Sequence, residues 1–223
     1  MAISYVNKNS AVGKAVQLTG VTAGNLIVCM LQWQDNATTP TLSDGTNSPT
    51  GYGTVVTNIN AQLIRFAYWL SSPKSGTVTY TWTASGGGHT AHVFEMSCSG
   101  TWGLDTVDAG ATGASGTAVS ANETSSETSM VAFGGAGFYY STSYSSGTLD
   151  SGAVDQVTSA TDSSYGALGV ATMRVMSNPG TYGSSIIASY TLEKWAADLI
   201  AFKETSSSSS VPVFMYNYRL RRN

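Results

Sequence analysis

Apolar and polar residues alternate along much of this chain. The alternation is strictest in residues 77–83, where Val78, Tyr80 and Trp82 share one side and threonines take the other. A period of two predicts a strand with one buried face and one solvent-facing face. Residues 26–33 form a continuous apolar run instead, which is typical of a central strand covered on both faces.

Further apolar runs at 61–70 and 89–98 are bounded by clusters of turn residues such as Gly, Ser and Pro. We therefore predict strands in both runs. Residues 192–203 are the best helix candidate in the chain, but we interpret them as a turn followed by a strand. The reason is an apparent internal repeat, in which this segment matches residues 89–98.

The order of these features recurs in the second part of the chain. Met130, which opens an apolar run, follows Leu26 by 104 residues, and Pro179 follows Pro73 by 106 residues. Either duplication or convergence on one strand order explains the matching offsets. We predict an all-β fold in which two pseudo-repeated halves interleave into a two-sheet antiparallel β-sandwich of the jelly-roll type.

The composition supports a β-protein with few charges. Charged residues are 10% of the sequence and hydrophobic residues 42%, whereas disordered chains combine few apolar residues with high net charge. The net charge of −3 argues against a nucleic-acid partner, which would need a concentrated positive surface. The first residues do not form a basic-then-apolar leader, and no run of about 18 apolar residues exists. We therefore expect neither a secretory signal nor a membrane partner.

Candidate catalytic groups are few. His89 and His92 are three residues apart, which places them on opposite faces of a strand, so we expect no shared metal ion. Glu95 and Asp198 are the candidate carboxylates for sugar hydrolysis, and we interpret both as outward-facing residues at matching positions of the halves. The sequence contains no Gly-x-Ser-x-Gly motif. We predict a protein that is not an enzyme and has no metal and no cofactor.

The two cysteines, Cys29 and Cys98, both lie in apolar strand-like runs. Two cysteines do not make a disulfide framework. We interpret them as buried free thiols, with a single disulfide between them as the alternative.

Two long polar stretches, residues 35–60 and 139–164, follow the first apolar run of each half. Long loops on a rigid frame are where binding is most often found, and Tyr and Ser on loops form adaptable contact surfaces. The predicted binding residues of these loops are Tyr52, Tyr139, Tyr140 and Tyr144.

A run of five serines at 206–210 marks the end of the domain formed by residues 1–205, because such a run is a flexible spacer. The segment 211–223 beyond it is apolar and aromatic. It either returns to the edge of its own sandwich or acts as an arm that docks on a neighbouring subunit. The predicted contact residues of this arm are Val213, Phe214, Tyr216, Tyr218, Arg219 and Arg221.

Several short motifs are shared with a known group of domains. They are TAGNLIV at 22–28, SDGTN at 43–47, AYW at 67–69, GTVTYTW at 76–82, and EMS at 95–97 followed by Leu104-Asp105 and a Gly/Ala/Thr-rich stretch. This order resembles β-sandwich domains of bacteriophage virion structural proteins and of secreted bacterial proteins, over roughly residues 15–205. The resemblance implies a β-sandwich and carries over no catalytic residues.

These observations favour a non-enzymatic virion structural protein, such as a capsid decoration or tail component, assembled in the host cytoplasm through its C-terminal arm. Its partners would be other virion subunits or further copies of itself in a homo-oligomer. The alternative is an extracellular carbohydrate-binding module whose loop tyrosines bind a surface glycan. A glycoside hydrolase comes third.

Overall fold

The computed structural model describes residues 2–34, 39–57, 63–114, 117–120, 122–139, 143–149, 152–188 and 194–205. All regular elements in these ranges are strands, and all strand pairs are antiparallel.

In chain order the strands of the first half are β1 (Ser4–Val12), β2 (Ala15–Val21), β3 (Leu26–Gln34), β4 (Thr41–Ser43), β5 (Gly51–Tyr52), β6 (Val56–Thr57), β7 (Leu63–Trp69), β8 (Gly76–Thr83) and β9 (Gly87–Ser97). Those of the second half are β10 (Thr101–Val107), β11 (Ala111–Ala114), β12 (Thr117–Val119), β13 (Glu123–Ser125), β14 (Met130–Tyr139), β15 (Tyr144–Leu149), β16 (Gly152–Ala153), β17 (Gln156–Asp162), β18 (Ala167–Met176), β19 (Gly180–Tyr182), β20 (Ser184–Ala188) and β21 (Lys194–Thr205).

The two halves have the same topology. Each contains a large sheet, with the order β1-β9-β3-β7-β5 in the first half and β10-β21-β14-β18-β17 in the second. Each also contains a small sheet, β2-β8-β4 in the first half and β12-β20-β15-β16 in the second, next to the pair β13-β19. Eight strands of each half therefore correspond in order, which supports the predicted repeat, while β6, β11, β13, β16 and β19 have no counterpart.

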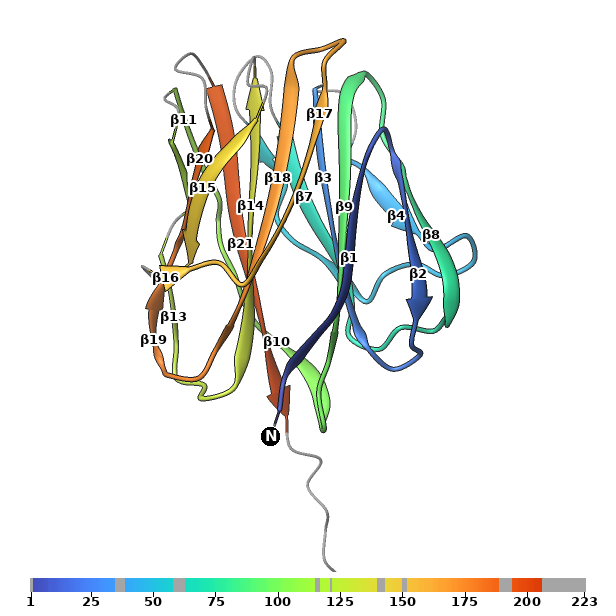
Figure 1. The fold of residues 1–223 in the computed structure, drawn as a ribbon, viewed down its shortest axis with the longest axis vertical. Coiled ribbons are helices and arrows are strands. Elements are labelled where there is room, and N and C mark those ends of the chain that lie inside the picture. Colours follow the sequence, from blue (N-terminus) through green and yellow to red (C-terminus); the bar gives the residue numbers. More distant parts are fainter. Residues whose placement is uncertain are drawn as a thin grey trace, which may run out of the picture.

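The halves are stacked side by side, in four layers (Figure 1). The two large sheets lie in the middle and the small sheets on the outside. An antiparallel β-sandwich is thus confirmed, but the predicted interleaving is wrong, because no sheet combines strands from both halves. Each half is a two-sheet sandwich of its own.

The layer between the two large sheets is an apolar core shared by the halves. Its buried members are Leu26, Val28, Met30, Phe66, Tyr68, Phe94, Met96 and Trp102 with Val131, Phe133, Ala171, Met173, Ile200 and Phe202. Ring pairs cross it: the centroids of Tyr68 and Phe202 are 4.9 Å apart, and those of Phe94 and Phe133 are 5.5 Å apart. Aromatic pairs at these distances stabilise a core beyond the area that they bury.

The contacts across this layer are reciprocal. β9 packs on β17 and β18, while its counterpart β21 packs on β6 and β7. Such a pattern is that of a two-fold interface between identical subunits, here formed within one chain.

Burial on both sides explains the continuous apolar runs. β3 has the small sheet on one face and the second half on the other, and eight of its nine residues are buried. The prediction for residues 26–33 is therefore confirmed. Residues 194–205 likewise form a strand, not a helix, and the alternation that buries one face of β8 is as predicted.

Side chains from the large sheet close both edges of the small sheet in the first half. On the β2 edge, the Asn7 and Asn9 amides donate to the carbonyls of Thr19 and Gln17, at 2.8 and 2.7 Å. These side chains satisfy backbone groups that an open edge would leave unpaired.

On the β4 edge, the backbone N–H of Leu42 donates to the hydroxyl of Tyr52 at 3.0 Å. Arg65 donates to the carbonyl of Pro40, and its guanidinium lies 4.0 Å from the centroid of the Tyr52 ring. In the second half, Arg174 of β18 donates to the carbonyl of Leu149 at 2.5 Å in the same manner. Arg65 of β7 and Arg174 of β18 thus each satisfy a backbone carbonyl at the edge of the small sheet in their own half.

Candidate functional site

A line of polar side chains is buried between the two halves. His92 of β9 contacts the hydroxyl of Thr158 through Nδ1 at 3.0 Å and that of Thr90 through Nε2 at 3.3 Å. Thr90 in turn donates to the side-chain carbonyl of Gln32 at 3.1 Å. His92 has no solvent exposure, and burial lowers its pKa to about 3. The imidazole is therefore neutral near pH 7.

Asp198 is the second ionisable group in this layer. Its Oδ1 accepts the N–H of Leu199 at 2.8 Å, and its Oδ2 has no hydrogen-bond partner among the described residues. Oδ2 faces Gly53 of the first half, where an added Cβ would lie 3.4 Å away. Burial, together with the negative charges of Asp108 and Glu123, raises the pKa of Asp198 well above its usual range.

His92 and Asp198 occupy matching positions in the two halves. His92 pairs with Met30 on the neighbouring strand, and Asp198 pairs with Gly135 on the strand that corresponds to it. The pseudo-two-fold arrangement thus places an ionisable side chain at the same position of each half.

The expectation that Glu95 and Asp198 are outward-facing and equivalent is wrong. Both are fully buried. Glu95 faces the small sheet of its own half, where its Oε1 accepts the Thr22 N–H at 2.8 Å and the Asn25 amide at 2.7 Å. It thereby fixes the turn between β2 and β3. The two carboxylates lie on opposite sides of a large sheet and do not form a pair for sugar hydrolysis.

The two histidines lie on opposite faces of β9, as predicted, and the cysteines agree in part with the prediction of buried free thiols. His92 points into the layer between the halves, whereas the Nε2 of His89 lies 3.1 Å from the carbonyl of Ser85, so the two rings take opposite faces of β9. Cys29 and Cys98 are free thiols, the former buried and the latter half-buried. Within the described ranges, no three His, Cys, Asp or Glu side chains gather as metal ligands.

Replacing Asp198 with asparagine should stabilise the protein at neutral and alkaline pH. A raised pKa in the folded state means that this group's contribution to stability is present below its unfolded pKa and lost as the pH rises. Asparagine avoids the buried charge, so we expect a gain of about 1–3 kcal/mol at pH 8 that shrinks towards pH 4. Urea unfolding of both proteins at several pH values measures it. A gain that is independent of pH would contradict the assignment.

The predicted loop tyrosines do not form one cluster. Tyr52 is on β5, where it pairs with Ala67 in the middle of β7, and its hydroxyl closes the edge of β4. Tyr144 begins β15 and packs on the core of the second half. Tyr139 ends β14, and Tyr140 lies outside the described residues.

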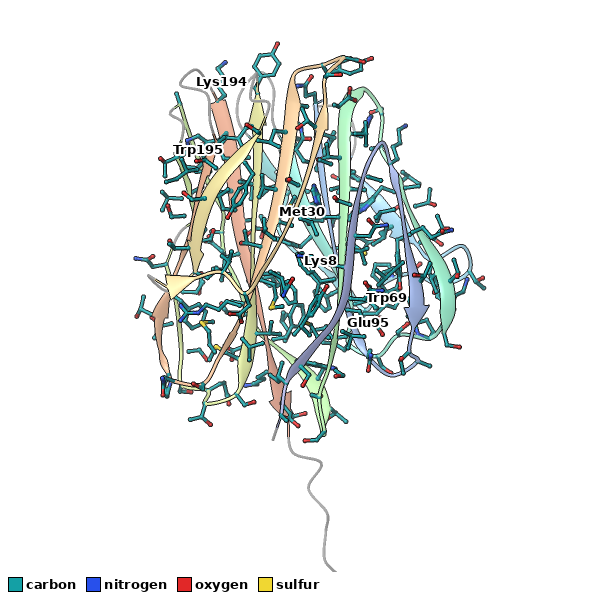
Figure 2. The ribbon with its side chains drawn as sticks, viewed as in Figure 1. Lys8, Met30, Trp69, Glu95, Lys194 and Trp195 are labelled. Carbon is teal, nitrogen blue, oxygen red and sulfur yellow. The ribbon has the colours of Figure 1, made fainter. Side chains whose placement is uncertain are left out.

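Two ends of the molecule can be distinguished. The loop end holds Tyr139 and the β17–β18 turn, because Tyr139 pairs with Ala167 at the start of β18. Tyr165 in that turn is 52% exposed, and Lys194 lies at the same end (Figure 2). The terminal end holds Thr205, which pairs with Thr101, and the start of β1 (Figure 1). Tyr139 thus belongs to the loop end, while Tyr52 does not.

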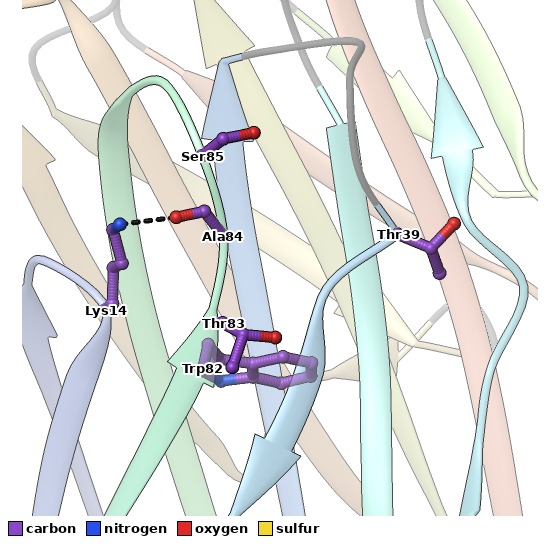
Figure 3. A pocket seen from close by; sticks show the side chains of 6 residues that line it. All are labelled: Lys14, Thr39, Trp82, Thr83, Ala84 and Ser85. Carbon is purple, nitrogen blue, oxygen red and sulfur yellow. Dashed lines mark hydrogen bonds between the residues drawn. The ribbon is translucent and has the colours of Figure 1, made fainter.

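One open pocket lies at the rim of the first half (Figure 3). Its volume is 370 Å³, and its lining residues are Lys14, Thr39, Trp82, Thr83, Ala84 and Ser85. No motif in the sequence points to it, because its lining comes from the β1–β2 turn, the approach to β4 and the end of β8. These segments meet only through sheet pairing.

The serine run at 206–210 and the arm at 211–223, with all of its predicted contact residues, lie outside the described residues. The last described strand, β21, ends at Thr205.

Comparison with known proteins gives no family: no family model, no curated protein and no solved structure matches this chain. Among the described residues, no helix is long and apolar enough to cross a membrane.

Proposed function

We propose that this chain is a non-enzymatic structural protein of a bacteriophage virion, a capsid decoration or tail component that is anchored by residues 211–223. The resemblance of residues 15–205 to virion β-sandwich domains supports this reading. So does the burial of the polar groups His92, Glu95 and Asp198, which leaves them out of reach of a substrate.

The observation that carries the proposal is the position of β21. This strand pairs with β14 on one side and with β10 and β11 on the other. Glu204, near its end, accepts the Ser99 hydroxyl and the Gly100 N–H, both at 2.7 Å. A segment that continues from Thr205 therefore starts from a firmly held strand at the terminal end, opposite the loop end. An arm there would anchor the frame and leave the loops outward.

Removal of the residues after Thr205 should abolish assembly without unfolding the frame. We expect the full chain to form oligomers, or to bind particles that lack it, and the shortened chain to remain monomeric with an unchanged melting temperature. Light scattering after size exclusion measures the mass, and co-sedimentation with particles measures the binding.

A full-length variant with Phe214→Ser, Tyr216→Ser and Tyr218→Ser is the matched control, because it keeps the length of the arm and removes its aromatic contacts. It should behave like the shortened chain. If all three proteins had the same oligomeric state and bound particles equally well, the anchoring role would be refuted.

A further inference from the structure

The pocket at the rim of the first half is built around a fixed lysine. Gly13 adopts a φ of 105°, which favours glycine, and its N–H donates to the His89 carbonyl at 2.7 Å. The Lys14 carbonyl accepts the Trp82 N–H at 2.8 Å. The Lys14 ammonium donates to the carbonyl of Ala84 (Figure 3). Backbone and side chain of Lys14 are thus both held against the end of β8.

The ammonium of Lys14 is the charged group among the residues that line this pocket. An ammonium carries three donors, and the bond to Ala84 uses one of them. Over the part of the chain that the structure describes, no carboxylate forms an ion pair with Lys14, whereas Lys74 pairs with one carboxylate and Lys203 with two. The other lining residues are uncharged, so the pocket presents one positive charge.

The remaining lining residues favour a ligand that is held by hydrogen bonds over one that stacks on an aromatic ring. The Trp82 side chain is only 1% exposed, so it forms a closed floor and cannot serve as a stacking platform for a sugar ring. Thr39 and Ser85 bring hydroxyl groups to the lining, whereas the Thr83 hydroxyl is hydrogen-bonded to Thr41. A volume of 370 Å³ lies at the lower end of the range of small-molecule sites.

We propose that this pocket binds the carboxylate-bearing sugar unit of an acidic glycan, with the carboxylate on the Lys14 ammonium and the sugar hydroxyls on Thr39 and Ser85. A charge-assisted hydrogen bond supplies the main attraction, and the hydroxyl-rich lining suits a ligand with many hydroxyl groups. None of the lining residues belongs to the arm or to the predicted tyrosines. It adds a glycan contact to the proposed structural role and does not depend on that role.

The test uses sodium glucuronate and glucose as probes of the full chain, with ligand-observed saturation-transfer NMR to detect weak binding. We expect glucuronate to bind at least about tenfold more tightly than glucose, since only glucuronate can pair with the ammonium. Lys14→Gln should remove this preference. Ser85→Tyr, which places a ring in the pocket and keeps the charge, should weaken glucuronate binding as well.

Lys8→Gln is the control, because it removes a positive charge from the neighbouring strand and does not line the pocket. It should bind glucuronate like the unmodified chain. Melting temperatures of the variants show that each is folded. Equal binding of glucuronate and glucose, or glucuronate binding that survives both Lys14→Gln and Ser85→Tyr, would overturn the proposal. Its outcome is independent of whether the shortened chain still assembles.

Discussion

Replacing Gly169 with alanine should destabilise the protein by about 3 kcal/mol or more. Gly169 is on β18 and faces the first half, where an added Cβ would lie 1.9 Å from Thr90 Oγ1 and 2.7 Å from His92 Nε2. No real side chain tolerates such distances, so Thr90 or His92 must move. Either movement breaks buried hydrogen bonds to Gln32 or Thr158. Urea unfolding, or a melting temperature lower by about 6–12 °C, measures the loss.

Gly180→Ala is the matched control. Gly180 is also in a strand of the second half, and nothing lies within 4 Å of a Cβ added there. Alanine reduces the entropy of the unfolded chain, so Gly180→Ala should change stability by less than about 1 kcal/mol. Equal effects of the two substitutions would show that the halves can separate slightly at Gly169 without cost.

Replacing His92 with glutamine should make the protein less sensitive to acid. The unfolded imidazole has a pKa of about 6.5, and the folded one has a pKa of about 3. As the pH falls through this interval, the unfolded state binds a proton that the folded state does not bind, so stability is lost. At about 1.4 kcal/mol for each pH unit, the full interval amounts to about 4–5 kcal/mol.

The measurement is the difference in unfolding free energy between the two proteins from pH 7 to pH 4. Taking the difference cancels the contributions of other groups, including that of Asp198, which has the opposite sign. Glutamine can still bond to Thr158, so the variant should fold and should lose a smaller part of its stability in acid. If the unfolding free energies of the two proteins fell in parallel between pH 7 and pH 4, His92 would be accessible to water in the folded state.

The sequence predicts much of the strand content because alternation and turn residues act locally. Residues 77–83 become β8, and the turn residues at 70–75 fall between strands, whereas Gly87 and Gly88 belong to β9 and part of the Gly/Ala/Thr-rich stretch forms β11. Residues 194–203 belong to β21, as expected from their match with residues 89–98, whereas residues 192 and 193 lie outside the described residues. The repeat therefore carried information that no single segment holds.

The stacking of the halves was missed although the sequence contains a signal for it. In a plain two-sheet sandwich each strand has one face towards solvent, so only alternating patterns are expected. Continuous or nearly continuous apolar runs occur in β3, β14, β18 and β21, and these strands are buried on both faces, as is the more polar β9. Runs of this kind in both halves indicate a further layer on each large sheet.

The candidate sites were harder to predict, because they depend on register between distant strands. Aligning Leu26 with Met130 is off by one position: Leu26 and Val131 face the shared core, whereas Met130 faces the other way. A shift of one residue exchanges the two faces of a strand. Register also separates Glu95 from Asp198, because the counterpart of Asp198 is His92, three residues before Glu95. Tyr52 lies in the short strand β5, whose pairing with β7 no local pattern in the sequence indicates.

The pairing of β21 on both sides has a mechanical consequence for an anchored protein. A pull on the chain beyond Thr205 would act along the strand axis, so the hydrogen bonds to β10, β11 and β14 would resist it together and not one after another. Tension from an attachment point would therefore be shared across the second half before any single bond fails.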